Sequence, residues 1–127
     1  MKQPDKASVG IVGEKLVAKF LKNTGFEIIE TNYRKPWGEI DIVAKRDGIL
    51  CFVEVKAMHK TVASRGYRPE DHVGEWKKKR LSRVIRTYLA EKRIDENTDF
   101  EIVVAAILLD FDDKKATIRL VENVLLG

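Results

Sequence analysis

Residues 100–109 form a nearly uninterrupted apolar run, which constrains the fold of this chain more than any other segment. A strand that is apolar on both faces has to be covered on both faces, as in the middle of a sheet between helices. Helical periodicity occurs in residues 8–24 and again in residues 73–93, which supplies helices to pack on such a sheet. The run therefore predicts an α/β fold with a buried central strand.

Weaker strand signals fill the rest of the chain. Alternating or short apolar runs between turn residues predict strands at 27–31, 39–45, 49–58 and 116–121. Asp47-Gly48 predicts a tight turn that joins two of them in a hairpin. Ser8 is expected to cap the first helix and Gly25 to end it. The order α-β-β-β-α-β-β predicts a central mixed sheet flanked by helices, in a single domain at 1–127.

The composition fits one compact cytoplasmic domain. The chain has 127 residues, of which 44% are hydrophobic, so it can bury a core without a disulfide or a structural metal. Its one cysteine, Cys51, lies in an apolar run and predicts a buried free thiol in a reducing compartment. No window approaches the roughly 20 apolar residues of a membrane span. We therefore expect no membrane partner.

Basic residues are concentrated in one part of the chain. The formal net charge is +4, and residues 56–93 contain twelve Lys or Arg against four Asp or Glu. Such a region indicates a polyanionic partner, because Lys and Arg bound to phosphates release condensed counterions. The residues expected to contact nucleic acid lie on the second helix and in a long polar loop at 57–74: Lys79, Arg83, Arg86, Lys60 and Arg65. A solvated helix face is the alternative interpretation.

Three charged residues on the predicted hairpin carry the strongest chemical signal. Asp41 and Glu54 fall opposite each other, where side chains approach within about 5 Å, and Lys56 shares the face of Glu54. Two carboxylates this close repel each other unless a cation separates them. Mg²⁺ suits them because it is a hard cation that takes oxygen ligands, and the carbonyl of Val55 is a further candidate ligand. An ordinary surface ion pair is the alternative interpretation of Glu-x-Lys.

Residues around this hairpin refine the prediction. Glu14 projects at the edge of the apolar stripe of the first helix, where its carboxylate can reach the rim of a site on the sheet. Alternation along 39–45 places Ile40, Ile42 and Ala44 on the face opposite Asp41. Trp37 follows Pro36 at a turn, and it either stacks on a base or packs against the edge of the sheet.

Four segments, at 13–18, 31–34, 38–44 and 52–56, together resemble the YraN family of small bacterial proteins. That family is similar to the restriction-endonuclease-like superfamily with its PD-(D/E)xK pattern, and in particular to archaeal Holliday-junction resolvases. The resemblance implies a restriction-endonuclease-like core with four site residues: the helix acid Glu14, the metal-binding Asp41, and Glu54 and Lys56 as the ExK pair. Two positions depart from the patterns, because Met58 stands where the family usually has arginine and Ile40 replaces the superfamily proline.

The expected function is Mg²⁺-dependent hydrolysis of DNA phosphodiester bonds, with Mn²⁺ able to substitute. The resemblance implies a structure-selective endonuclease that acts on branched or flapped DNA in repair or recombination, for which a homodimer would be suitable. DNA is the expected substrate, and a small-molecule substrate is not expected. A non-catalytic nucleic-acid-binding module that retains the nuclease fold is the alternative, and a scaffold for another protein is a third possibility.

Overall fold

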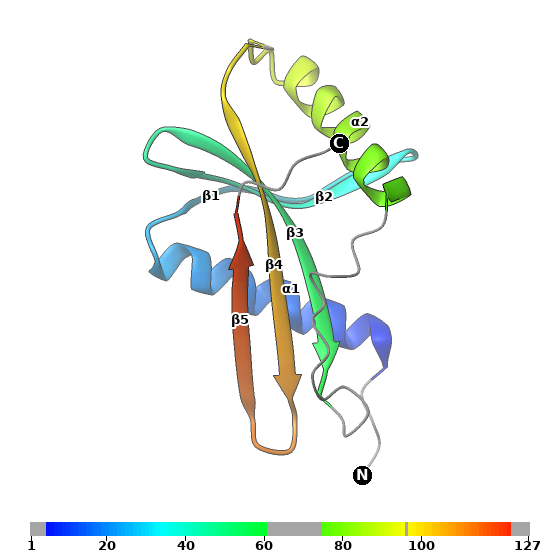
Figure 1. Cartoon of the computed structure of the whole chain (residues 1–127), viewed down its shortest axis with the longest axis vertical. Helices are drawn as coiled ribbons and strands as arrows, with labels where there is room; N and C mark the ends of the chain where they lie inside the picture. Colours follow the sequence, from blue (N-terminus) through cyan, green and yellow to red (C-terminus); the bar gives the residue numbers. More distant parts are fainter. Residues whose placement is uncertain (1–4, 61–74, 96, 123–127) are drawn as a thin grey trace.

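The computed structural model describes residues 5–60, 75–95 and 97–122. Its helices and strands follow the predicted order (Figure 1): α1 Lys6–Asn23, β1 Glu27–Lys35, β2 Gly38–Arg46, β3 Ile49–His59, α2 Glu75–Glu91, β4 Phe100–Asp110 and β5 Lys115–Val121. The predicted α/β class and element order are confirmed. The predicted loop at 57–74 starts too early, because β3 continues to His59, and 61–74 lie outside the described residues.

The five strands form one mixed sheet in the order β1-β2-β3-β4-β5. β1, β2 and β3 are antiparallel neighbours, β3 and β4 are parallel, and β5 returns antiparallel to β4. A parallel pair needs a crossover between its strands, and the segment that contains α2 provides it. β3 and β4 therefore lie in the interior of the sheet, as the apolar run at 100–109 predicted.

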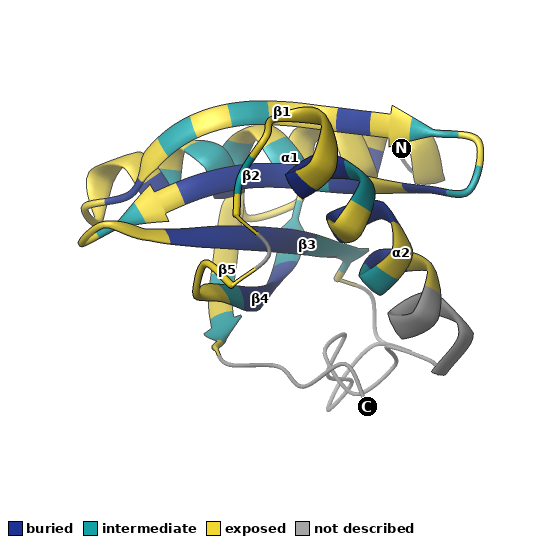
Figure 2. Ribbon diagram, turned by 90° about the horizontal axis from the view of Figure 1, so that it is seen from above, coloured by how far each residue is buried: buried dark blue, intermediate teal, exposed yellow. Residues whose placement is uncertain are grey.

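The two helices cover opposite faces of the sheet. On one face, Val17 and Leu21 of α1 pack with Val53 and Ile107. On the other face, the buried side of α2 packs with Phe52 and other residues in a second cluster. Figure 2 shows the two helices on different sides of β2 and β3. In the described part of the chain, no helix is long and apolar enough to cross a membrane.

The first helix begins earlier than the sequence predicted. Asp5, rather than Ser8, is the N-cap residue, and its Oδ1 accepts a hydrogen bond of 2.7 Å from the backbone N–H of Ser8. This bond satisfies one of the N–H groups that a helix leaves without a backbone partner in its first turn. The predicted end is confirmed, because Gly25 follows the helix with a φ of +100° that favours glycine.

The β1–β2 hairpin also differs from the prediction. β1 extends to Lys35, so that Pro36 and Trp37 form the turn before β2. Ile40 packs in the α2 cluster while Ile42 packs against α1, so the prediction that they share a face is wrong. The regular alternation of β2 is therefore broken between Ile40 and Ile42. On the paired strand, Asn32 lies between their partners Tyr33 and Thr31 and has a left-handed conformation with a φ of 55°.

Candidate active site

The candidate site begins where β2 and β3 separate. From the turn at 47–48, the two strands pair regularly as far as Ile42 opposite Val53, and one further step along this register places Asp41 opposite Glu54. Beyond that point the backbone N–H of Val55 donates a hydrogen bond of 2.7 Å to Oδ2 of Asp41. A carboxylate therefore takes the place of the backbone acceptor that a continuous antiparallel ladder would supply.

Asp41 and Glu54 are the acids at this separation. Glu54 is only 5% exposed and is the one buried charged residue in the described part of the chain. Burial and the neighbouring Glu54 carboxylate raise the pKa of Asp41 to about 8, although the Val55 hydrogen bond opposes this shift. Two neighbouring carboxylates, one buried and one half-buried, favour either a shared proton or a bound cation.

The backbone of Val55 contributes a third oxygen. The N–H and C=O of one residue in a strand point to the same side, and the Val55 N–H points toward Asp41. The Val55 carbonyl therefore also points into the space that opens between β2 and β3. Among the described residues, no three His, Cys, Asp or Glu side chains are grouped closely enough to hold a metal ion. A cation here would need the carbonyl or non-protein oxygens in addition to the two carboxylates.

Helix α1 brings Glu14 to the same site. Gly13 allows α1 to lie directly on the sheet, because a Cβ at this position would be 2.7 Å from Cβ of Ala57 and 3.1 Å from Cγ2 of Ile107. The next residue, Glu14, is half-buried, and burial raises the pKa of its carboxyl, with a hydrogen bond from Asn32 opposing the shift. Glu14 thus contributes a third acid near Asp41 and Glu54.

These groups line one open cleft of about 570 Å³, which we call the acidic cleft. Its charged lining includes Glu14, Arg34, Glu39, Asp41, Glu54 and Lys56. Lys56 is half-buried and lies two residues beyond Glu54 on β3. The structure therefore brings together in one cleft all four residues that the sequence predicted as catalytic, three acids and this lysine.

Arg34 and Glu39 are lining residues of the acidic cleft that were not predicted as site residues from the sequence. Arg34 and Glu39 face each other across the β1–β2 hairpin, with 3.2 Å between Arg34 Nε and Glu39 Oε2. Arg34 Nη2 also donates a hydrogen bond of 3.3 Å to Oδ1 of Asn32. The feature of the sequence that could have predicted this pair is Pro36-Trp37, because a two-residue turn there brings Arg34 opposite Glu39. The alternation predicted for 39–45 already placed Glu39 on the same face as Asp41, whereas only the hairpin brings Arg34 to the same place.

The predicted nucleic-acid contacts are more dispersed. Arg83 and Arg86 lie exposed on α2, whereas Lys60 lies just beyond the end of β3 and forms an ion pair of 3.9 Å with Asp110. Lys60 is absent from the lining of the acidic cleft. The Lys79 side chain and the whole of Arg65 lie outside the described residues. Two of the five predicted contacts are therefore exposed on one helix near the site.

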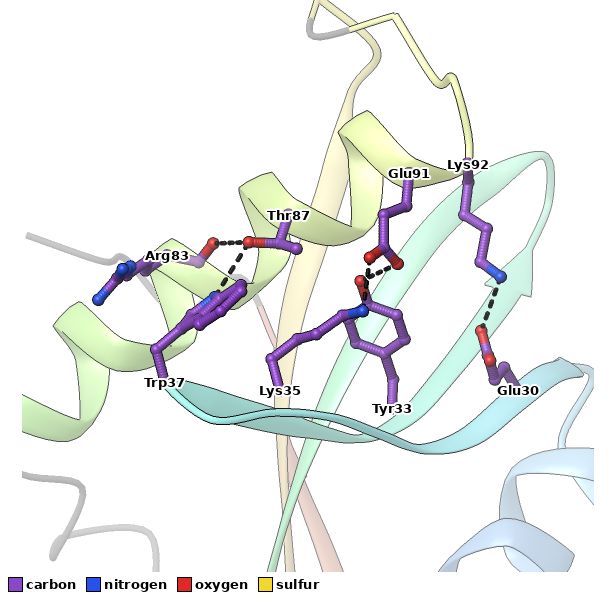
Figure 3. Close-up of polar contacts among 8 residues, drawn as sticks. All are labelled: Glu30, Tyr33, Lys35, Trp37, Arg83, Thr87, Glu91 and Lys92. Atoms are coloured by element: carbon purple, nitrogen blue, oxygen red, sulfur yellow. Dashed lines mark hydrogen bonds and ion pairs between the residues drawn. The ribbon is translucent and has the colours of Figure 1, made fainter.

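Trp37 packs between the hairpin and α2. Its Nε1 donates a hydrogen bond of 3.1 Å to Oγ1 of Thr87, and the guanidinium carbon of Arg83 lies 5.1 Å from the ring centroid (Figure 3). Farther along the hairpin, Glu91 accepts a hydrogen bond from Tyr33 and forms an ion pair with Lys35, each at 2.5 Å. Of the two interpretations of Trp37, packing is the one its contacts support, with a helix rather than the sheet edge as the partner.

Comparison with known proteins places this chain among bacterial relatives. The family model described as "Uncharacterised protein family UPF0102" matches residues 13–105, which include Glu14 and all of β2 and β3. A UPF0102 protein of Alkaliphilus metalliredigens is 40% identical over 108 residues, covering 84% of this chain and 90% of the relative. One of Campylobacter hominis is 35% identical over 115 residues, covering 91% of each. The chain therefore belongs to the UPF0102 family, which is the YraN-like family that its motifs predicted.

Proposed function

We propose that this protein is a metal-dependent nuclease that hydrolyses DNA phosphodiester bonds in the acidic cleft. The observation that carries the proposal is the convergence of Asp41 and Glu54 at the end of the β2–β3 ladder. Burial and mutual repulsion raise the pKa of Asp41 to about 8. Such an arrangement is costly for folding, so a bound cation that neutralises it is the simplest function for it.

The donor atoms fit Mg²⁺. The carboxylates of Asp41 and Glu54 and the carbonyl of Val55 are hard oxygen ligands, and Mg²⁺ is commonly held by one or two carboxylates together with water and phosphate oxygens. Mn²⁺ accepts the same ligands and is expected to substitute. When bound, the ion would supply Lewis-acid polarisation of a phosphate and a more acidic water.

The remaining side chains have distinct roles in this proposal. Lys56 orients the attacking water or stabilises the negative charge that develops on the phosphate. Glu14 completes the acidic rim from α1 and does not bind the ion directly. The motif resemblance supports a place in the restriction-endonuclease-like superfamily and suggests branched or flapped DNA as the substrate. The buried free thiol of Cys51 suits a reducing cytoplasm.

The test is cleavage of single-stranded, duplex, flapped and four-way DNA with Mg²⁺ or Mn²⁺. Asp41→Asn and Lys56→Ala should each lower the cleavage rate at least about 100-fold, because each removes a group that acts on the scissile phosphate. Asp47→Asn and Lys45→Ala are matched controls, since they make the same changes at exposed positions of the hairpin, away from the cleft. Both controls should retain the parental rate.

The alternative is a nucleic-acid-binding module without activity. It predicts salt-sensitive DNA binding, no cleavage of any substrate with either ion, and an effect of Lys56→Ala no larger than the loss of one charge. Stability provides a separate measurement. If Mg²⁺ up to millimolar concentrations leaves the midpoint of thermal unfolding unchanged in the parent protein, the proposed metal site is wrong.

A further inference from the structure

A second hollow of about 320 Å³ adjoins the acidic cleft, and we call it the arginine hollow. It lies between the β1–β2 hairpin and α2, and its charged lining comprises Arg34, Lys35, Glu39, Glu54 and Arg80. Arg34, Glu39 and Glu54 also line the acidic cleft. The two hollows therefore adjoin each other at these three shared residues.

Arg34 lies at the junction of the two hollows. Its side chain is 70% exposed, and its ion-pair partner Glu39 is 55% exposed. An ion pair with this exposure contributes little to stability, so a phosphate can replace the carboxylate at little cost. The planar guanidinium is also able to bind two phosphate oxygens at once.

Arg80 provides the second cation from the opposite wall. Its Nε donates a hydrogen bond of 3.4 Å to the carbonyl of Trp37. The helix lies close to the hairpin here, because a Cβ on Gly38 would be 3.2 Å from the carbonyl oxygen of Arg80. Figure 3 shows two further contacts between α2 and the β1–β2 hairpin, one through Thr87 and one through Glu91. The fold therefore holds the backbone segments that carry the two arginines against each other.

The basic lining continues along α2. Arg83 is three residues beyond Arg80 and Arg86 is three beyond Arg83, so the three follow one side of the helix. Arg83 and Arg86 are exposed, and Arg83 lies over the ring of Trp37. The row leads away from the acidic cleft, starting at the arginine hollow.

We infer that the arginine hollow binds the phosphate next to the scissile one, with Arg34 and Arg80 as its ligands. The nucleic-acid backbone then runs from the acidic cleft across the hairpin and along α2 toward Arg86. This inference rests on the proposed nuclease function for the identity of the neighbouring phosphate. The hollow itself is a site for a nucleic-acid phosphodiester, whether or not the chain cuts it.

The experiment measures binding separately from cleavage. Fluorescence anisotropy of a fluorescein-labelled four-way DNA junction is recorded across a range of salt concentrations, with Ca²⁺ in place of Mg²⁺ to prevent cutting. Arg34→Gln and Arg80→Gln should each weaken binding roughly 3- to 10-fold and make the log–log salt slope shallower by about 1. Lys19→Gln is the control, because it removes an exposed charge from α1 outside both hollows.

Charge-conserving variants separate contact from folding. Arg34→Lys and Arg80→Lys should recover the parental salt slope but only part of the affinity, since they restore the positive charge without the guanidinium fork. Thermal unfolding of every variant checks that the fold is retained. If both glutamine variants bind with the affinity and slope of Lys19→Gln, the inference is overturned, even when the protein cleaves DNA. If they weaken binding as expected but no substrate is cut, the phosphate site is retained and the nuclease proposal fails.

Discussion

The two ends of the β2–β3 hairpin differ sharply in what their side chains do. Near the turn at 47–48, regular backbone pairing brings buried apolar residues such as Ala44 and Cys51 opposite each other. At the other end the ladder stops, a carboxylate accepts the Val55 N–H, and the buried residue is Glu54. The same two strands thus contribute stability at one end and present reactive groups at the other, because only an interrupted ladder leaves backbone oxygens and acids accessible together.

Mutations near the turn should affect stability alone. Phe52→Ala removes a fully buried ring that packs edge-to-face against Tyr88 and Phe100, and we expect it to lower the free energy of unfolding by about 3–5 kcal/mol. Ile49→Ala, at a 38% exposed position on the same strand, should cost less than about 1 kcal/mol. Urea unfolding measures both. A large fall in the cleavage rate per folded molecule of Phe52→Ala would show that the two ends are not independent.

The open end should make stability depend on pH when metal is absent. The pKa of Asp41 is raised to about 8, whereas an unfolded aspartate titrates near about 4. Between these values the folded chain keeps a proton that the unfolded chain has released, so the free energy of unfolding falls as pH rises from about 4 to about 8. In EDTA we therefore expect Asp41 to contribute a fall of several kcal/mol over this range. Asp41→Asn should lack that fall, and an identical pH profile for both proteins would contradict the assignment.

Two glycines of α1 test how the helix supports the open end. Gly13→Ala places a methyl group 2.7 Å from Cβ of Ala57, so we expect a loss of about 1–3 kcal/mol and slower cleavage as Glu14 shifts. Gly10→Ala makes the same change where a Cβ would meet nothing within 4 Å. It should stabilise the helix by up to about 1 kcal/mol. Thermal unfolding compares the pair, and equal effects would mean that α1 does not lie on the sheet as described.

The contact between the hairpin and α2 should have a smaller effect. Trp37→Phe removes the hydrogen bond to Thr87 but keeps an aromatic ring, and we expect it to lower the free energy of unfolding by about 1 kcal/mol. Thr87→Val removes the same bond from the other side. In urea unfolding, the double variant should cost less than the sum of the two single variants. Strict additivity would indicate that the bond contributes nothing.

The sequence predicted those features that depend on local pattern. The turn at 47–48 and the two-residue spacing along a strand predicted the pairing of β2 with β3, which the observed register confirms as far as Ile42 opposite Val53, one step before Asp41 and Glu54. The apolar run at 100–109 was enough to place β4 in the interior of the sheet. These predictions succeeded because a strand repeats every two residues and a short turn fixes which residues face each other.

Other features depend on contacts that a local pattern does not contain. The change of face between Ile40 and Ile42 occurs opposite Asn32, whose left-handed conformation on the neighbouring strand is not visible in the alternation of β2 itself. Both Asp5 and Ser8 are residue types that cap helices. Asp5 is the N-cap because the backbone is still extended at Asp5 and already helical at Ser8, which the residue types alone do not reveal. Arg34 and Arg80 come together only when α2 docks on the hairpin, so charge clustering along the sequence could not reveal the hollow that they share.

The parallel pairing of β3 with β4 determines how early a growing chain can complete this site during synthesis. Asp41, Glu54 and Lys56 all emerge from the ribosome before β4, so at that stage β3 is an edge strand with an open row of backbone groups. Only after Asp110 has been made can β4 cover that edge and fix β3 from both sides. Until then the unpaired edge of β3 is a place where another chain could pair, which makes this the stage of synthesis most open to premature association.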